Sequence, residues 1–274
     1  MFSRNRVAYG AVLFVFGVVL AGCSASDADP EAAALPITTL SDGELTACLY
    51  SGFAPFSSID ENGEWIGWDV DYLADFAAAH GLQLKPVDQG SFDGIWQKPG
   101  QDICDVSGSG IGDTQERQDA SPKTDWSNHY YTVTRAFAVR AGKADSLKDV
   151  TDLAKKTVIV TRASAADLDL EQQILQKDVP NVTVEYTEDE VGAAQAVIDG
   201  DAFAYGGGLG SIEYLVSQFP GQLVVAWEHQ ILEPDGTNGN ESFSFVMRED
   251  SAGLTDALNS YIDSHRDSYG TSGE

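Results

Sequence analysis

ICDVSGSGIGDTQER, residues 103–117, joins a strand-like apolar segment to a run of small residues, which a polar turn and an arginine follow. Five of the six residues from 107 to 112 are Gly or Ser, so the end of the predicted strand carries almost no side-chain bulk. One interpretation is an ordinary surface loop with a solvated Arg117. The other is a backbone surface open to a small anionic ligand, with Arg117 reaching back as a bidentate clamp. The rest of the chain decides between them.

The segments before this stretch alternate between strand and helix patterns. Residues 44–50 alternate weakly in polarity and read as a strand. Residues 69–82 read as a helix with one apolar face, formed by Val70, Leu73, Ala74, Ala77 and Ala78. Further strands are predicted at 82–87 and 103–109, with a short helix at 90–100 between them. This alternation predicts a parallel α/β lobe.

The segments after Arg117 repeat this architecture without repeating its sequence. Residues 132–142 are extended and apolar at alternate positions. Residues 164–178 read as a helix that Ser164 caps, with acids in its first turn. The other predicted elements are a short helix at 147–156, strands at 157–163 and 181–186, a helix at 188–200, a strand at 201–208, an extended segment at 222–229, a strand at 242–249 and a helix at 251–265. They predict a second α/β lobe.

The chain is strongly acidic. It has 16 Lys and Arg against 43 Asp and Glu, which gives a net charge of −27. Such a surface repels nucleic acid and anionic lipid, so we expect neither as a binding partner. The part expected to fold starts near residue 43 and is long enough for two lobes of about 100 residues each.

The first residues have the pattern of an export signal. Two arginines precede an apolar run of fourteen residues at 7–20, which is too short for a comfortable membrane span. The sequence LAGC at 20–23 resembles the lipobox of bacterial lipoproteins, in which Cys23 is acylated and becomes the mature N-terminus. We therefore expect a signal peptide at 1–22 and a flexible acidic tether at 23–42. The protein would then be extracytoplasmic, anchored to the cell membrane by lipidated Cys23; plain secretion is the alternative.

Two cysteines remain once Cys23 is set aside. In an exported protein the even remainder suggests a disulfide between Cys48 and Cys104. The alternative is two small buried residues in strands, which is a common use of free cysteine.

The sequence resembles the family-3 extracellular solute-binding proteins, receptors of polar amino-acid ABC importers. The resemblance covers residues 44–265, and its two most specific parts are the block APF…DENGEWIGWDVDYL and the motif TQER. The segments that carry it are ACLYSGFAPFSSIDENGEWIGWDVDYL (47–73), CDVSGSGIGDTQER (104–117), DWSNHYY (125–131), SLKDVTDLAKKTVIV (146–160) and SFSFVMRED (242–250).

The family fold implied by the resemblance is a pair of α/β lobes with mixed, mainly parallel sheets. Two crossover strands join the lobes, which close on the ligand (the Venus-flytrap, or type II periplasmic-binding-protein, fold). In this chain lobe one would take residues 43–134 and 231–274, and lobe two residues 135–230. The crossings would lie at 132–142 and near 228–245.

The resemblance also implies a binding site. Arg117 matches the residue that holds the ligand's α-carboxylate, and Gly110 and Gly112 match residues that contact the ligand through backbone or hydroxyl groups. Small residues at Ser109, Gly110 and Gly112 let the backbone approach a ligand closely. Phe53 matches an aromatic that commonly stacks on the ligand, and Tyr50 replaces a variable position that is sometimes acidic.

Lobe two would contribute the stretch TRASAAD, which aligns with the family's Gly-Thr-Thr segment. Ser164 can offer a hydroxyl, and the start of its helix can offer free N–H groups to an anion. Ala163 and Ala165 depart from the family pattern, which weakens this half of the carboxylate site, and Ser164 is equally a plain helix cap. Arg162 lies at a mouth position where it could contact a second acidic group; solvation is the alternative.

The family usually holds the ligand's ammonium with an aspartate after the strand that matches DAFAY. Gly206, Gly207 and Gly208 stand there instead, and their alternative role is strand packing or hinge clearance. Without a charge partner a buried ammonium is costly, so we expect weak binding of simple α-amino acids unless another acid substitutes, with Glu213 and Asp113 as candidates.

The function that follows is a non-catalytic, monomeric receptor that delivers a small carboxylate-bearing solute to ABC permease subunits. We expect no cofactor and no metal, and no catalytic residue is assigned. The four histidines lie outside any motif, and the chain contains no HExxH, CxxC or GxSxG. The alternatives are a dehydratase of the same fold and a ligand-sensing module.

Overall fold

The computed structural model describes residues 36–233, 235–251 and 253–265, which belong to one structural unit. The predicted signal peptide, Cys23 and the tether up to residue 35 lie outside the described residues. Within the described part of the chain, no helix has both the length and the apolar character needed to span a membrane.

The first large sheet has the strand order β5-β1-β6-β15-β7. The central β1 (Glu44–Leu49) runs parallel to β5 (Gln83–Asp88) and β6 (Val106–Ser107). The late strand β15 (Val246–Arg248) runs antiparallel to β6 and to β7 (Thr124–Trp126). We call this sheet, with α1 (Trp68–Ala79), α2 (Gln115–Asp119) and α6 (Leu254–His265), lobe one.

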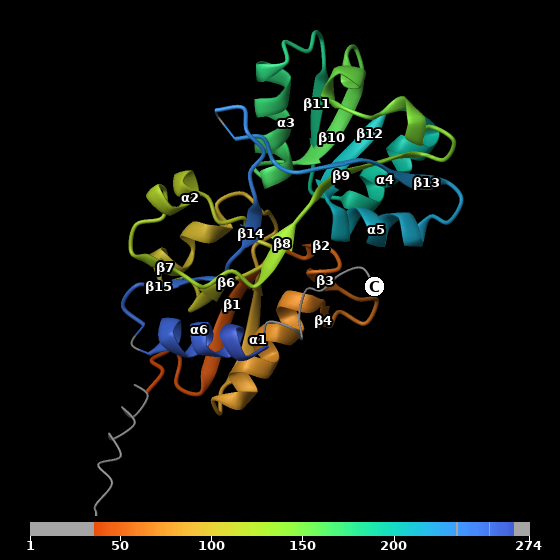
Figure 1. Cartoon of the computed structure of the whole chain (residues 1–274). Helices are drawn as coiled ribbons and strands as arrows, with labels where there is room; N and C mark the ends of the chain where they lie inside the picture. The colour runs from red at the N-terminus through yellow and green to blue at the C-terminus, as the bar shows by residue number, and fades with distance from the viewer. Residues whose placement is uncertain (1–35, 234, 252, 266–274) are drawn as a thin grey trace, which may run out of the picture. The chain divides into compact units, whose positions relative to one another are not determined.

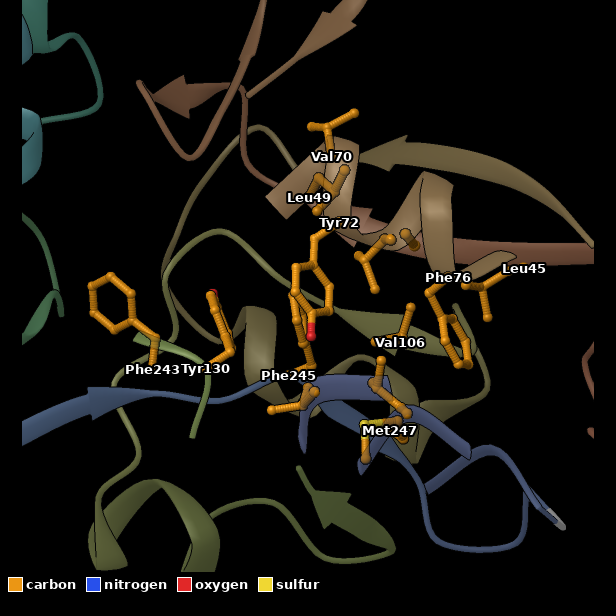
Figure 2. Close-up of a cluster of buried hydrophobic side chains, with 14 of the residues drawn as sticks. Leu45, Leu49, Val70, Tyr72, Phe76, Val106, Tyr130, Phe243, Phe245 and Met247 are labelled. Carbon is orange, nitrogen blue, oxygen red and sulfur yellow. The ribbon is translucent and has the colours of Figure 1, made fainter. Parts of the chain in front are cut away.

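The core of lobe one is formed by segments from both ends of the described chain. Figure 2 shows Leu45 of β1, Tyr72 and Phe76 of α1, Phe245 and Met247 of the returning chain gathered on one face of the sheet. The Tyr130 and Phe245 rings stack with centroids 4.2 Å apart. The returning segment is therefore part of this core rather than an appendage to it.

The second large sheet has the order β11-β10-β12-β9-β13. Here β10 (Thr157–Thr161) runs parallel to β11 (Thr183–Thr187) and β12 (Ala204–Gly208). The strand β9 (Arg135–Arg140) pairs antiparallel with β12 and with β13 (Leu223–His229). With α3 (Ala165–Gln176), α4 (Glu190–Asp199) and α5 (Leu209–Gln218), this sheet makes lobe two, which has separate apolar clusters around the sheet.

Two crossing segments connect the lobes. The chain leaves lobe one through β8 (Tyr131–Val133) and returns through β14 (Glu241–Phe243), and these two strands pair antiparallel (Figure 1). The predicted single strand at 242–249 is thus two strands, β14 and β15, because each pairs in a different sheet.

The remaining elements are short. The strands β2 (Gly52–Phe53), β3 (Ser57–Ile59) and β4 (Trp65–Ile66) form a small antiparallel sheet. The predicted short helix at 90–100 is two 3₁₀ turns, η1 (Ile95–Gln97) and η2 (Pro99–Gln101), and the one predicted at 147–156 is the 3₁₀ turn η4 (Val150–Leu153). A further 3₁₀ turn, η3 (Ala144–Ser146), precedes it and was not predicted. The helices α2 and α5 were not predicted from the sequence.

The disulfide between Cys48 and Cys104 is confirmed. Cys48 lies in β1 and Cys104 lies two residues before β6, and both side chains are fully buried. The bond therefore joins two neighbouring strands directly beneath the loop that begins SGSG.

Candidate functional site

A small pocket lies where strands from both lobes end. Tyr50 follows β1, Thr161 ends β10, and the glycines at 206–208 end β12, so carboxyl ends of parallel strands converge there. Its cavity volume is about 30 Å³, room for about two water molecules. The lining residues are Tyr50, Phe53, Phe92, Gly110, Arg135, Thr161, Ser164, Ala165, Ala166, Glu190, Tyr205, Gly206, Gly207, Gly208 and Phe243.

Hydrogen bonds from one lobe to the other border the pocket. The Tyr50 hydroxyl donates to the Glu188 carbonyl at 2.7 Å, and the Ser91 hydroxyl donates to the Glu188 carboxylate at 3.2 Å. The Arg117 guanidinium donates to the Ala163 carbonyl at 2.7 Å. A ligand larger than the cavity can enter only if these contacts separate first.

A buried carboxylate fixes the shape of the SGSG loop. One oxygen of Asp69, in the first turn of α1, accepts the N–H groups of Ser109 at 2.7 Å and Gly110 at 2.8 Å and the Tyr130 hydroxyl at 2.8 Å. Gly110 has φ +62°, and an added Cβ would overlap the Phe53 ring. Small residues are thus required here by the close approach of Phe53 and by the loop's own backbone.

Replacing Asp69 by alanine should lower the free energy of unfolding by about 2–3 kcal/mol, because three buried donors lose their acceptor.

Burial raises the pKa of Asp69 to about 6 from 3.8. The free energy of unfolding is therefore highest below about pH 4 and falls as pH rises through about 6, so the cost of Asp69→Ala is read at pH 4. Urea unfolding from pH 4 to 8 measures both effects. Asp69→Asn keeps an acceptor and should lose only the pH dependence. This account would be contradicted if the free energy of unfolding of Asp69→Ala were less than 0.5 kcal/mol below that of wild type.

Arg117 is buried beside the pocket, with 3% of its surface exposed. Its guanidinium donates to the Gly112 carbonyl at 2.9 Å and to Ala163, and lies 4.5 Å from the Trp96 ring centroid. Its Nε has no hydrogen-bond partner among the described residues. Burial lowers the pKa of Arg117 to about 10. The hydrogen bonds of Arg117 go only to neutral carbonyls, and Glu241, the acid that most favours its charged form, is already paired with Arg135. A buried cation in this environment favours a further anion as a partner.

The start of α3 faces the same pocket. The Ser164 side chain caps this helix and accepts the Asp167 N–H at 3.2 Å, as predicted from the sequence. Ala165 and Ala166 then line the pocket in the first turn, where N–H groups have no partner within the helix. Ala163 has φ +55°, a conformation that glycine adopts more easily, so the Ala at this position changes the residue type but keeps the glycine-like turn.

The structure brings together part of the predicted site. Tyr50, Phe53, Gly110 and Ser164 line the pocket, and Arg117 adjoins it. The other three predicted residues do not line it. The Ser109 hydroxyl accepts the Tyr50 N–H at 2.8 Å, the Gly112 carbonyl holds Arg117, and exposed Arg162 lies 4.0 Å from the Tyr186 ring centroid. Ser109 and Gly112 therefore hold residues of the site in place, and a ligand contact of the exposed Arg162 stays a prediction.

The glycines of β12 line the pocket, and no acid stands beside them on that strand. Gly206 also serves packing, since an added Cβ would lie 2.7 Å from the Phe137 ring. The two acids proposed as substitutes are misplaced. Glu213 is exposed on α5, and Asp113 interacts with Gln118 and His129 outside the pocket.

Two charged groups in the pocket were not predicted. Glu190, the first residue of α4, is 6% exposed and accepts the Tyr205 hydroxyl at 2.6 Å. Arg135, at the start of β9, forms a buried ion pair with Glu241 of β14, and its Nε donates to Glu241 at 2.7 Å. The ion pair ties the two crossing segments together. A lone arginine inside the apolar run TVTRAFAV was a signal that could have indicated it.

No group of three or more His, Cys, Asp or Glu side chains in the described ranges could hold a metal ion. The pocket and its immediate surroundings offer Arg117, Glu190, the Arg135–Glu241 pair and helix N–H groups, arranged among aromatic rings. This set suits recognition of a small charged molecule.

The model of the bacterial extracellular solute-binding proteins, family 3, matches residues 45–271. The chain belongs to this family. A curated relative, the probable histidine-binding protein of Neisseria gonorrhoeae, is 29% identical over 109 residues, which are 40% of this chain and 39% of the relative. The chain thus matches well under half of that relative's length.

Solved structures share the fold over most of the chain. The arginine-bound truncated ArgBP of T. maritima has a TM-score of 0.68 and 26% identity, covering 81% of this chain and 96% of its own. An ancestral arginine-binding protein bound to arginine has a TM-score of 0.70 and 25% identity, covering 82% and 93%. AncCDT-1, an ancestral amino acid-binding protein and precursor of cyclohexadienyl dehydratase, has a TM-score of 0.67 at 23% identity, covering 82% and 90%, which supports the fold alone.

These comparisons confirm the family and the two-lobed α/β fold expected from the sequence. Because the family is one of extracellular proteins, membership indicates a location outside the cytoplasm.

Proposed function

We propose that this family-3 solute-binding protein captures a small carboxylate-bearing solute, an amino acid or a close analogue, and delivers it to an ABC permease. The observation that carries the proposal is Arg117, a buried guanidinium at the pocket with an unpartnered Nε and only carbonyl groups as acceptors. A ligand carboxylate would supply the charged hydrogen-bond acceptor that none of these carbonyl groups provides.

The carboxylate lies, in this proposal, between Arg117 and the start of α3. A Cβ added to Gly112 would be 3.0 Å from a Glu241 carboxylate oxygen, 3.1 Å from an Arg117 nitrogen and 3.5 Å from the Ala165 Cβ. The guanidinium and the first turn of α3 are therefore neighbours, with Glu241, which is paired with Arg135, beside them. The N–H groups of Ala165 and Ala166, at the positive end of the helix dipole, add favourable donors for an anion. Phe53 and Tyr50 enclose the rest of the ligand.

An amino acid is the ligand class that the relatives support. Their names include histidine-binding and arginine-binding proteins, and one related ancestral structure is described as bound to glutamine. In our proposal residues 43–134 with 231–274 and residues 135–230 are the two lobes that close on the solute. The predicted lipid at Cys23 would keep the monomeric protein beside its permease without a membrane-spanning helix.

A thermal-shift screen tests this function. The standard L-α-amino acids, their desamino analogues and small organic acids are each added at millimolar concentration. At about 100 times the Kd, a ligand stabilises the folded protein by about 2.7 kcal/mol, which should raise Tm by about 5–10 °C. Sugars and polyamines of similar size are the controls and should leave Tm unchanged. The proposal fails if no carboxylate shifts Tm by more than the controls do.

A further inference from the structure

Glu190 is a pocket acid without a cationic partner. Its side chain accepts one hydrogen bond, from the Tyr205 hydroxyl at 2.6 Å, and none of the ion pairs among the described residues includes it. Arg135, the cationic side chain that lines the pocket, is already paired with Glu241. Glu190 is therefore the acid in the pocket lining that remains available to a ligand cation.

The groups that face Glu190 do not neutralise it. Asp189 precedes it on the same turn, Tyr205 comes from β12, and Tyr50 comes from lobe one. Burial raises the pKa of both tyrosines well above their usual value, so both stay uncharged near neutral pH. Burial likewise raises the pKa of Glu190 to about 8, with Asp189 contributing in the same direction. Without a ligand, Glu190 is therefore mainly protonated near neutral pH, and a ligand cation beside it would favour loss of the proton.

Short contacts connect Glu190 to the proposed carboxylate position. The Ser164 N–H, at the start of α3, donates to the Thr161 carbonyl at 3.2 Å. The Thr161 hydroxyl lies 3.3 Å from the Tyr205 hydroxyl, which donates to Glu190. All of these residues line one cavity of about 30 Å³. A compact zwitterion, with its ammonium and carboxylate on one carbon atom, suits a single small cavity better than a ligand charged at distant ends.

We propose that Glu190 binds the ammonium group of an α-amino acid in this pocket, in the role that no residue of Gly206–Gly208 can fill. The assignment rests on the proposed function, since it takes the carboxylate to lie at Arg117 and α3. It also removes the basis for expecting weak binding of simple α-amino acids, because that expectation required a pocket without an acid.

Binding should release a proton. At pH 7 the empty pocket holds Glu190 mainly in its protonated form, while an ammonium ligand requires the carboxylate. Affinity for an α-amino acid should therefore rise up to tenfold per pH unit as pH increases toward about 8, and then level off. Calorimetric titration in phosphate and in Tris at pH 7 gives the number of protons released per ligand bound, because the two buffers differ in ionisation enthalpy.

The test compares wild-type protein with Glu190→Gln. The probes are the standard L-α-amino acids, beginning with arginine, histidine and glutamine, each beside its analogue without the α-amino group. We expect Glu190→Gln to weaken the best amino acid at least tenfold and to change the affinity of its desamino analogue less than threefold. Proton release should fall from nearly one per ligand to nearly zero. Glu213→Gln, the same change at an exposed position of α5, is the matched control and should behave as wild type.

Each outcome decides the assignment. Equal losses for the amino acid and its analogue, or unchanged proton release in the variant, would show that Glu190 does not contact the ammonium. If wild type binds desamino acids but no amino acid, Glu190 is wrongly assigned while the proposed function stands. If no carboxylate binds at all, both fail. Should Glu190→Gln not fold, the wild-type buffer comparison still decides, since binding of an amino acid without proton release contradicts the proposal.

Discussion

Replacing Arg117 by alanine is expected to lower the affinity for the carboxylate ligand at least thirtyfold. Within lobe one the guanidinium lies over the Trp96 ring and donates to the Gly112 carbonyl, so these two contacts can position it even when its bond to Ala163 of lobe two separates. Loss of one partner of a buried, hydrogen-bonded charge pair costs about 2–5 kcal/mol. Calorimetric titration of the best ligand from the thermal-shift screen measures the loss directly.

The control must separate binding from folding. Arg117→Ala also removes the contacts to Gly112 and Ala163, so circular dichroism and urea unfolding of the ligand-free variant have to accompany the titration. Arg117→Lys keeps the charge but loses the bidentate geometry and should bind with intermediate affinity. Arg140→Ala, at an exposed position of β9, should bind like wild type. Unchanged affinity in a folded Arg117→Ala variant would remove Arg117 from the site.

Most strands and helices could be predicted because short sequence patterns identify them locally. Strands such as β10 are short apolar runs, and α3 begins at a serine with acids after it. The helix α5 was missed because it begins directly after three glycines without a side-chain cap and has Gly210 and Ser211 in its first turn. The helix α2 is only five residues long, too short for any periodicity to show.

The buried face of α1 shows how tertiary packing overrides a pattern. The sequence alone indicated a stripe that included Ala78, yet Ala78 is exposed and the large side chains Tyr72 and Phe76 are buried instead. Both rings meet Tyr261 of α6, with centroid separations of 5.3 and 5.6 Å. In a helix rich in alanine, aromatic rings decide which face packs, and their partner here comes from the far end of the chain.

The charges of the pocket could not be predicted for a related reason. The loop before Arg117 is one continuous segment with its own signature, and the resemblance identified it. Arg135 and Glu241 are 106 residues apart, and they meet only because the two crossing strands pair. Glu190 occupies an ordinary helix start, and nothing local distinguishes it from its exposed neighbour Asp189. Long-range topology creates its burial and therefore its chemistry.

Removing the disulfide by the paired change Cys48→Ala and Cys104→Ala should lower the free energy of unfolding by about 4 kcal/mol. The two cysteines are 56 residues apart in the chain. In the chain-entropy model, closing a loop of that length restricts the unfolded state by about this amount. Urea unfolding of wild type and variant measures the difference, and wild type unfolded in reductant is the matched control, since it breaks the bond without changing a side chain.

The two measurements should differ only by the packing that the alanine variant loses. Both cysteines are fully buried beside Ile95 and Trp96, in the cluster that carries Arg117, so alanine also leaves small voids that reduction does not. The double variant should therefore be less stable than reduced wild type by about 1 kcal/mol or less per void. A loss below 1 kcal/mol in reductant would contradict the entropic account. A lowered ligand affinity in the reduced but folded protein would instead show that the bond also holds the SGSG loop, and with it Arg117, in place.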